Sequence, residues 1–275
     1  MSVVSPPRAV GPLLRDWRQR RRMSQLDLAV DAEVSARHLS FVETGRSKPS
    51  RELVLHLAEH LDVPLRDRNS LLLAAGYAPT YHETPIDADE MAPVREALDR
   101  ILSGHTPFPA VVVDRRWDLV SGNQPALAIL AEGVDPRLLD PPANALRVTL
   151  HPDGLAPRIS NLAQYSAHLL DRLDRLIATT ADPGLVALRD ELVGYPGVRR
   201  SAATRSPAGP GGSVPDTVSR LFVPFVLRSG GTDLTFFSTI ATFGTAHDIT
   251  LAELSIESFF PADEVTAATL RSGWG

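Results

Sequence analysis

The chain has 275 residues, of which 43% are hydrophobic, and this is enough apolar material for two domain cores. It contains no cysteine, which excludes disulfides, thiolate metal sites and a cysteine nucleophile. The net charge of -5 argues against nucleic-acid binding by the whole surface, yet residues 1–56 hold ten Lys or Arg against six Asp or Glu. The apolar runs are too short for a membrane span and no signal peptide is evident, so we expect a cytoplasmic protein without membrane contact.

Helical periodicity dominates the first quarter of the chain. We expect residues 1–11 to be disordered and a helix to run from Pro12 to about Arg22. Two short helices follow, capped by Ser24 and Ser35, and Gly45 ends the second of them. Further helices are expected at about 50–61 and from Pro64 to Gly76. Residues 12–76 therefore form an all-α domain of five helices.

The second short helix has two distinct faces. Leu39 and Val42 point to a core, while Arg37, Ser40 and Phe41 lie on a face suited to the base edges of a major groove. The spacing of nine residues in this region resembles the lambda-repressor-like, or XRE-type, helix-turn-helix family. These residues are Gln25, Leu28, Ala29, Ser35, Leu39, Glu43, Gly45, Arg46 and Pro49.

This resemblance implies a DNA-binding surface that recognises a double-stranded operator. By analogy with the family, four residues would touch bases, namely Ala36, Arg37, Ser40 and Phe41, and four would hold phosphates, namely Gln25, Ser35, Arg46 and Lys48. Glu43 would pair internally with Arg18. Many members have Gly in the turn where this chain has Glu33. A left-handed backbone there is strained for Glu, so we expect a slightly different turn.

His56 to His60 in the fourth helix spell the H-x-x-E-H pattern of one class of zinc peptidase. Two imidazoles four residues apart can share a metal, but a zinc site also needs a third ligand and an open cleft. Within a packed DNA-binding module neither is expected, and the pattern is interpreted as structural.

Residues 77–89 contain two prolines and little periodicity, which predicts a linker. A helix follows in which Val94, Leu98, Ile101 and Leu102 share one face, suited to core packing, to a domain connection or to a dimer contact. Strands are expected at 109–114 and 117–123, then a helical segment that begins at Gln124, and two helices within 159–180 and 183–197.

The last third of the chain returns to strands. A polar Pro/Gly loop is expected at 199–216, and strands at 220–229, 233–244 and 253–262. The pair Gly230-Gly231 predicts a hairpin between the first two of these strands. Residues 90–275 are therefore predicted to be an α+β PAS-like domain, an antiparallel sheet with helices on one face, a fold that commonly encloses a small-molecule cavity.

The same region resembles the ligand-binding domain of MmyB-like regulators. The resemblance rests on VVVDRRWDLVSGN, NALRVTLHPDGLAPRISN and STIATFGTAHDITLAELSIESFFPADEVTAATLR. It implies a PAS-like domain that follows an XRE-type helix-turn-helix and binds a fatty acid or similar lipid. No other cofactor is implied.

A fatty-acid pocket needs an apolar tunnel and donors for a carboxylate. Aromatic and aliphatic residues on the strands are the tunnel candidates, although core packing explains each of them as well. They are Trp117, Phe222, Phe225, Phe236, Ile240 and Phe243. Candidate donors are Asn123, Arg158 and His168, of which Arg158 precedes a helix whose amides also suit an anion. For this arginine a surface or structural role is the alternative.

No nucleophile elbow, dinucleotide fingerprint or phosphate loop is present, and we do not expect an enzyme. The sequence predicts a transcription regulator that binds an operator as a homodimer, because one short helix reads only a half-site. Its second domain would sense a small apolar effector. Two alternatives stay open: a second domain that only recruits a protein partner, and an enzyme tethered to DNA.

Overall fold

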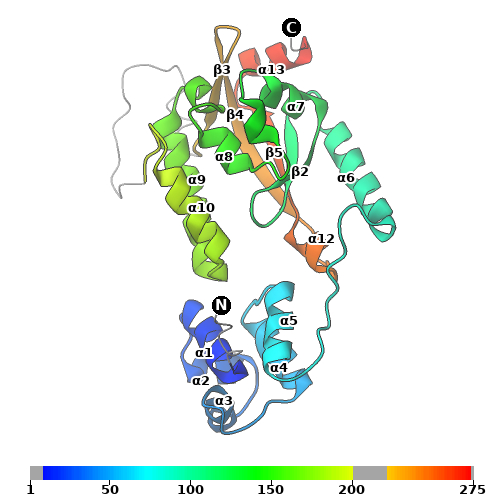
Figure 1. The fold of residues 1–275 in the computed structure, drawn as a ribbon, viewed down its shortest axis with the longest axis vertical. Helices are drawn as coiled ribbons and strands as arrows, with labels where there is room; N and C mark the ends of the chain where they lie inside the picture. The colour runs from blue at the N-terminus through cyan, green and yellow to red at the C-terminus, as the bar shows by residue number, and fades with distance from the viewer. Residues whose placement is uncertain (1–8, 201–221, 274–275) are drawn as a thin grey trace, which may run out of the picture. The chain divides into compact units, whose positions relative to one another are not determined.

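A computed structural model describes residues 9–200 and 222–273. These residues fall into two compact units. One holds the chain up to Thr84 together with residues 178–180 and 245–252, and the other holds the remainder. The chain up to Thr84 forms five described helices (blue to cyan in Figure 1): α1 (Val10–Arg20), α2 (Gln25–Asp31), α3 (Ala36–Glu43), α4 (Arg51–His60) and α5 (Leu65–Ala74).

Serine side chains start three of these helices. Ser24 forms a capping box with Asp27, in which each side chain bonds the other residue's backbone N–H. Ser35 accepts a hydrogen bond from the His38 N–H, and Ser50 caps α4 in the same way. The predicted caps at Ser24 and Ser35 are confirmed.

The turn between α2 and α3 differs from our expectation. Glu33 adopts a left-handed backbone with φ of 52°, so the turn keeps the conformation that glycine would favour despite the side chain. Glu33 is exposed, and its Cβ therefore meets solvent rather than the core. The expectation of an altered turn was wrong, because packing of the flanking helices outweighs the local strain.

Helix α1 begins two residues earlier than predicted. Val10 is buried, and a Cβ on Gly11 would lie 2.4 Å from the Val42 carbonyl oxygen, so α1 passes directly against the end of α3. The expectation of disorder therefore fails for Val10 and Gly11, while residues 1–8 lie outside the described residues. The core of the unit includes Leu14, Leu28, Leu39, Val54, Leu57, Leu61 and Leu72, each almost completely buried.

The segment after α5 packs rather than crossing open solvent. The Asn69 side chain accepts hydrogen bonds from the N–H groups of Thr80 and Tyr81. Further on, the Thr84 hydroxyl donates to Asp248 Oδ2 at 2.8 Å, and the Ile249 N–H donates to the His82 carbonyl. Asp248 and Ile249 stand at the start of the short helix α12 (Ile249–Glu253), which the sequence did not predict.

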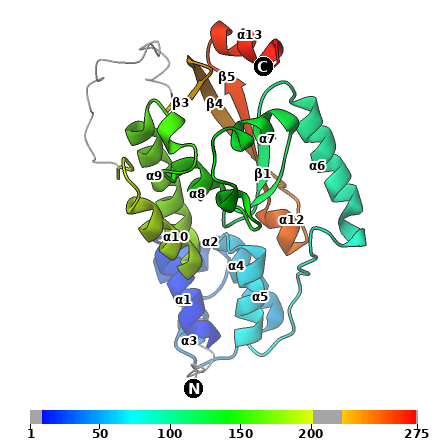
Figure 2. The ribbon, with the colours of Figure 1, turned by 45° about the horizontal axis from the view of Figure 1, so that its top comes forward.

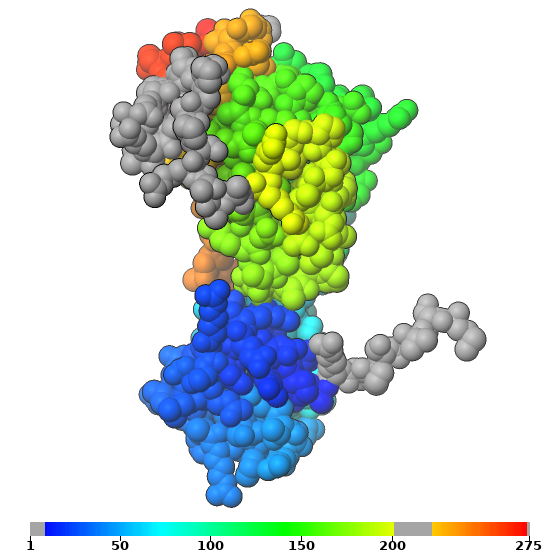
Figure 3. All heavy atoms as spheres, turned by 90° about the vertical axis from the view of Figure 1, so that its left-hand side faces the viewer, coloured from blue at the N-terminus to red at the C-terminus, as the bar shows by residue number. Residues whose placement is uncertain are grey.

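The second unit combines helices with one sheet. Its helices are α6 (Ala92–Gly104), α7 (Gln124–Ala131), α8 (Ala145–Leu150), α9 (Leu162–Thr180), α10 (Pro183–Val193) and α13 (Glu264–Arg271), with short 3₁₀ turns at Asp89–Met91, Pro136–Leu139 and Ala156–Arg158. Figure 2 shows α7 and α8 in front of the strands and α9 beside them, next to α10, and Figure 3 shows the outer side of α10 (yellow) at the surface of this unit.

The sheet has five antiparallel strands in the order β2-β1-β5-β4-β3. They are β1 (Ala110–Val113), β2 (Leu119–Gly122), β3 (Phe225–Ser229), β4 (Thr232–Thr242) and β5 (Ser255–Pro261). Gly230 and Gly231 both have positive φ angles in the turn between β3 and β4, so the predicted hairpin is confirmed. The chain is an all-α five-helix domain followed by an α+β domain.

Two expectations fall partly on residues without a described structure. Most of the predicted loop at 199–216 and the first two positions of the predicted strand at 220–229 lie outside the described residues. Within the ranges that are described, every helix is too short or too polar to span a membrane.

Candidate functional site

Helix α3 presents one face to solvent and buries the other. Leu39, Val42 and Glu43 are buried against the core of the first unit. Ser35, at the N-cap, and Arg37 are exposed, and Ala36, Ser40 and Phe41 are partly exposed, in agreement with the face predicted from the sequence. A helix packed in this way offers its outer face to a groove of about the same width.

Cationic side chains surround Phe41 on this surface. The guanidinium carbons of Arg37 and Arg46 lie 5.4 and 6.0 Å from the centroid of the Phe41 ring. Lys48 extends over Tyr77, with its Nζ atom 5.2 Å from that ring centroid. Such contacts hold the stems of the long side chains while their charges stay in water.

Glu43 fixes the buried side of α3. Arg18 donates to both of its carboxylate oxygens, at 2.7 and 2.8 Å, and Gln25 Nε2 donates to Oε2 at 2.8 Å. Burial favours a raised pKa for Glu43, but the hydrogen bonds from Arg18 and Gln25 and the positive charges of Arg18 and Arg15 lower that pKa on balance. The predicted pairing of Glu43 with Arg18 is confirmed.

Gln25, predicted to hold a phosphate, therefore already has a partner within the protein. Its amide is partly exposed, and release from Glu43 would leave both Arg18 hydrogen bonds in place. A phosphate oxygen can accept a hydrogen bond from the same N–H group. Gln25 can therefore bind Glu43 in the free protein and a phosphate in the complex with DNA.

The two histidines of the H-x-x-E-H pattern bind neighbouring protein groups. His56 Nε2 lies 2.8 Å from the Ala32 carbonyl oxygen, and His60 Nδ1 lies 2.9 Å from Asp31 Oδ2. Throughout the described ranges, no three His, Asp or Glu side chains converge in a way that suits a metal ion. Both imidazoles instead tie α4 to the end of α2.

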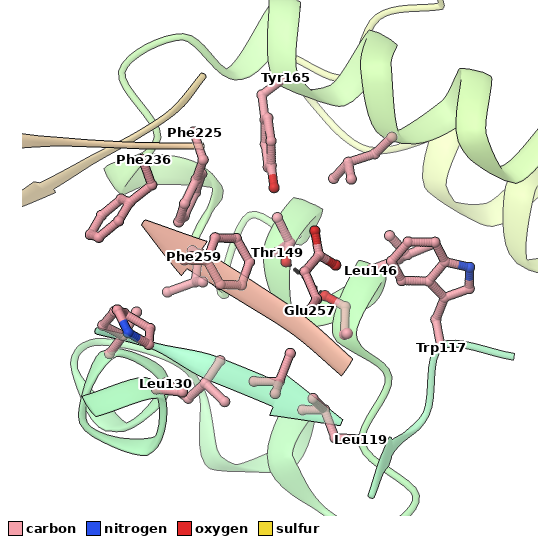
Figure 4. A pocket seen from close by; sticks show the side chains of 17 residues that line it. Trp117, Leu119, Leu130, Leu146, Thr149, Tyr165, Phe225, Phe236, Glu257 and Phe259 are labelled. Carbon is pink, nitrogen blue, oxygen red and sulfur yellow. Dashed lines mark hydrogen bonds between the residues drawn. The ribbon is translucent and has the colours of Figure 1, made fainter. Parts of the chain in front are cut away.

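An apolar cavity of about 80 Å³ lies within the second unit. Figure 4 shows its lining, in which residues of β1, β2, β3, β4 and β5 face residues of α7, α8 and α9. The lining consists of Pro109, Val111, Trp117, Leu119, Ala126, Ile129, Leu130, Ala145, Leu146, Thr149, Leu155, Tyr165, Leu169, Phe225, Phe236, Glu257 and Phe259. Known ligand pockets are commonly about 300–1,000 Å³, so a long ligand requires side chains to move.

The strand register explains which residues face the cavity. Phe236 and Phe225 form a cross-strand pair, and Glu257 of β5 stands between Val111 of β1 and Ile240 of β4. Because side chains alternate along a strand, these positions share one face of the sheet. Ring centroids of Phe225 and Phe236 are 5.9 Å apart, which closes one end of the cavity with aromatic surface.

Three of the six predicted tunnel residues line the cavity, namely Trp117, Phe225 and Phe236. The other three lie elsewhere. Phe222 packs against Phe237, with ring centroids 5.3 Å apart, on the opposite side of β4 from Phe236. Ile240 has the inward register but remains 46% exposed, because the covering helices do not reach that far along β4. Phe243 follows the end of β4.

The three predicted donors are also outside the cavity lining. Asn123 is buried and caps α7, and its amide also donates to the carbonyls of Leu102 and Phe108. Arg158 donates to the Glu132 carboxylate at 2.5 Å and to the Ile129 and Arg228 carbonyls. Both side chains are thus used to join elements of the fold.

His168, the third donor, lies on α9 one turn beyond Tyr165, with which its ring is stacked. Burial lowers the pKa of His168, and the positive charges of Arg172 and Arg175 lower it further. The imidazole is therefore neutral near pH 7 and carries no charge with which to attract a carboxylate.

The polar groups of the cavity were not predicted from the sequence. Glu257, Tyr165 and Thr149 line it, and Arg172 reaches Glu257 from α9 with Nη1 at 3.2 Å from Oε1. One signal was available: in β5 the alternation places Glu257 on the same face as Phe259, where a carboxylate interrupts an apolar surface.

Comparison with known protein families assigns a family to the second unit and another to the N-terminal helices. Residues 94–272 match the family described as "MmyB-like transcription regulator ligand binding domain". The chain belongs to this MmyB-like family. Residues 9–71 also match a helix-turn-helix domain family, so the protein is a DNA-binding transcription regulator with an MmyB-like ligand-binding domain. No curated protein matches the chain.

The MmyB-like match extends from α6 to the end of α13 and contains the whole cavity lining. The helix-turn-helix match contains α1 to α4 and most of α5. Both matched families are regulatory domains.

Proposed function

We propose that the protein binds an operator through α3 as a homodimer and that a small apolar effector in the second unit controls this binding. The effector class we propose is a fatty acid or a related lipid. The observation that carries the proposal is the apolar cavity in the MmyB-like unit of a chain that also holds a helix-turn-helix.

On the DNA side, Ala36, Arg37, Ser40 and Phe41 are the proposed base contacts. Their accessible position on the outer face of α3 supports this assignment. The proposed phosphate contacts are Gln25, Ser35, Arg46 and Lys48, which flank α3 in the chain. One α3 helix reads a half-site, and for this reason we propose a two-fold symmetric dimer.

On the effector side, the dominance of apolar side chains in the lining supports a hydrocarbon ligand. Effector control requires the ligand to have different affinities for the DNA-competent and incompetent arrangements of the protein. An apolar cavity within the unit favours effector binding over a second domain that acts only by recruiting another protein. Its mostly apolar surface likewise favours binding over catalysis, which depends on converging ionisable groups.

The test combines native mass spectrometry of the purified full-length protein with solvent extraction and identification of bound molecules. We expect a stoichiometric lipid, and we expect its removal or addition to change the affinity for operator DNA in fluorescence anisotropy. A protein that carries no lipid, binds none and shows unchanged DNA affinity would contradict the proposal.

A further inference from the structure

The two carboxylate oxygens of Glu257 differ in their hydrogen bonding. Its side chain is 7% exposed, and Oε1 accepts hydrogen bonds from Arg172 Nη1 at 3.2 Å and from the Ser238 hydroxyl at 2.8 Å. Within the described residues, Oε2 receives no hydrogen bond. Figure 4 shows the carboxylate among the apolar side chains of the cavity, so a free acceptor faces the space that a ligand would fill.

A second polar group in the cavity, the Tyr165 hydroxyl, has no hydrogen-bond partner among the described residues. Tyr165 of α9 is 6% exposed, and its hydroxyl makes no hydrogen bond to any described residue. In Figure 4 the hydroxyl points from α9 into the cavity. Burial raises the pKa of Tyr165, and the charge of Glu257 raises it further, so the hydroxyl keeps its proton and can donate.

Buried polar groups in folded proteins are nearly always hydrogen-bonded, and exceptions commonly mark sites that a missing molecule completes. Two exceptions within one cavity therefore indicate the polar end of a ligand. Together they offer one acceptor that carries negative charge and one hydroxyl that can donate or accept.

This inference rests on the proposed function and narrows it. Within the proposed class of fatty acids and related lipids, we propose that the cavity selects a related lipid whose polar group donates a hydrogen bond, a hydroxyl or an amine, over a fatty acid with a free carboxylate. An alcohol donates to Glu257 Oε2 and accepts from the Tyr165 hydroxyl, which satisfies both groups at once. An alkylammonium donates to Glu257 Oε2 and to the Tyr165 hydroxyl oxygen.

A carboxylate ligand fits this end of the cavity poorly. It has no proton to donate at neutral pH, and it would bring a second negative charge toward Glu257 in an environment that screens charge weakly. Arg172 offsets part of the charge of Glu257, but its guanidinium is already paired with that carboxylate and lies over the Trp117 ring at 4.5 Å, so it is not free to bind a ligand carboxylate. Arg172 is also outside the cavity lining.

The experiment compares three probes with the same eight-carbon chain: octan-1-ol, octylamine and octanoate. Binding to the full-length protein, freed of co-purified lipid, is measured by isothermal titration calorimetry at pH 7. We expect the alcohol and the amine to bind at least about tenfold more tightly than octanoate.

Two variants locate the effect. Glu257→Gln removes the negative charge but keeps the shape, so octanoate should gain affinity, octylamine should lose it, and the difference between the probes should shrink to within about threefold. Tyr165→Phe should weaken octan-1-ol about three- to tenfold. Glu191→Gln is the matched control, because that carboxylate pairs with Arg147 at the surface, away from the cavity, and should leave all three affinities unchanged.

The outcomes separate the two proposals. Octanoate binding as tightly as the alcohol and the amine in the unmodified protein would overturn the donor-headed ligand while supporting an apolar effector. Binding of none of the three probes, with no lipid found in the purified protein, would overturn both. Circular dichroism of each variant verifies the fold. If Glu257→Gln does not fold, the order of affinities of the three probes for the unmodified protein and for Tyr165→Phe still tests the donor-headed ligand.

Discussion

At the scale of single residues, Glu43 is a buried charge that joins three helices of the DNA-binding unit. Its side chain is 1% exposed, and its two oxygens take three hydrogen bonds from Arg18 and Gln25. Removing one member of a buried ion pair leaves the other charge without compensation, which typically costs about 3–5 kcal/mol.

We therefore expect Glu43→Ala to lower the free energy of unfolding by about 3–5 kcal/mol in urea titrations. The wild-type protein should also respond to acid at this site. The folded pKa of Glu43 is lowered from its ordinary value of 4.5, so its contribution is present above that value and is lost as pH falls below it. Between pH 5 and 3 the wild type should lose more stability than Glu43→Gln; parallel curves would contradict this.

Glu33 offers a prediction of opposite sign. A left-handed backbone costs a residue with a Cβ roughly 1–2 kcal/mol, and Gly avoids this cost. Glu33→Gly should therefore stabilise the protein, by up to about 1 kcal/mol after the greater chain entropy of Gly is included. Thermal unfolding by calorimetry measures this. A lower melting temperature in Glu33→Gly would show that the exposed side chain contributes more than the backbone strain removes.

The two kinds of proposed DNA contact differ in their effect on selectivity. Arg37→Ala should weaken operator binding by about 1–3 kcal/mol and relax sequence preference, because it removes a base contact. Lys48→Ala should weaken binding to all sequences alike and reduce the slope of affinity against salt by about one. Fluorescence anisotropy with operator and random DNA gives both numbers. Equal losses on both DNAs in Arg37→Ala would remove Arg37 from base reading.

At the scale of elements, the close contact between α1 and α3 requires glycine at position 11, because glycine has no side chain. The Cβ of an alanine at position 11 would lie 2.4 Å from the Val42 carbonyl and 2.7 Å from that of Glu43, and both are backbone atoms. The helices must separate to admit a methyl group, which overpacks the core.

Gly11→Ala should therefore destabilise the protein by about 1–3 kcal/mol and weaken operator binding, since it displaces the end of α3. Gly104→Ala is the control: this position ends α6, has nothing within 4 Å of the added Cβ, and has no positive φ. It should be neutral or slightly stabilising, as expected of alanine in a helix. Chemical denaturation of both variants makes the comparison, and equal stability would show that α1 shifts at no cost.

Elements with strong periodicity or caps were predictable from the sequence. The five N-terminal helices, the long helix α9 and the three C-terminal strands all follow such patterns. Helices α8, α12 and α13 were not predicted. They have only five to eight residues, and helices this short depend on packing more than on their own sequence.

The cavity was predictable only in part, for a physical reason. Alternation along a strand indicates which side chains face inward, but it does not indicate how far the covering helices extend. Phe236 and Ile240 point to the same face of β4, yet Phe236 is fully buried and Ile240 is 46% exposed. Tyr165 lies in a helix that was predicted from the sequence, but only the structure places its hydroxyl in the cavity.

At the scale of the whole molecule, the proposed dimer makes a geometric prediction about the operator. Two copies of α3 related by a two-fold axis should contact half-sites about 10–10.5 base pairs apart, or a multiple of this, in a palindromic sequence. Hydroxyl-radical footprinting on an operator selected from random DNA would show two symmetric protected patches. A single protected patch, together with a monomer mass in sedimentation equilibrium, would contradict the dimer.

The arrangement of Trp117 gives the protein a built-in optical signal. Its indole lines the cavity, and the Arg172 guanidinium lies 4.5 Å from the ring centroid while it pairs with Glu257. Indole emission responds to nearby charge and to water, so a molecule that binds Glu257 alters the surroundings of this fluorophore directly. Replacement of Trp17, which is buried in the separate core of the DNA-binding unit, by Phe would reduce the background from that unit. Effector entry can then be followed in real time without any attached label.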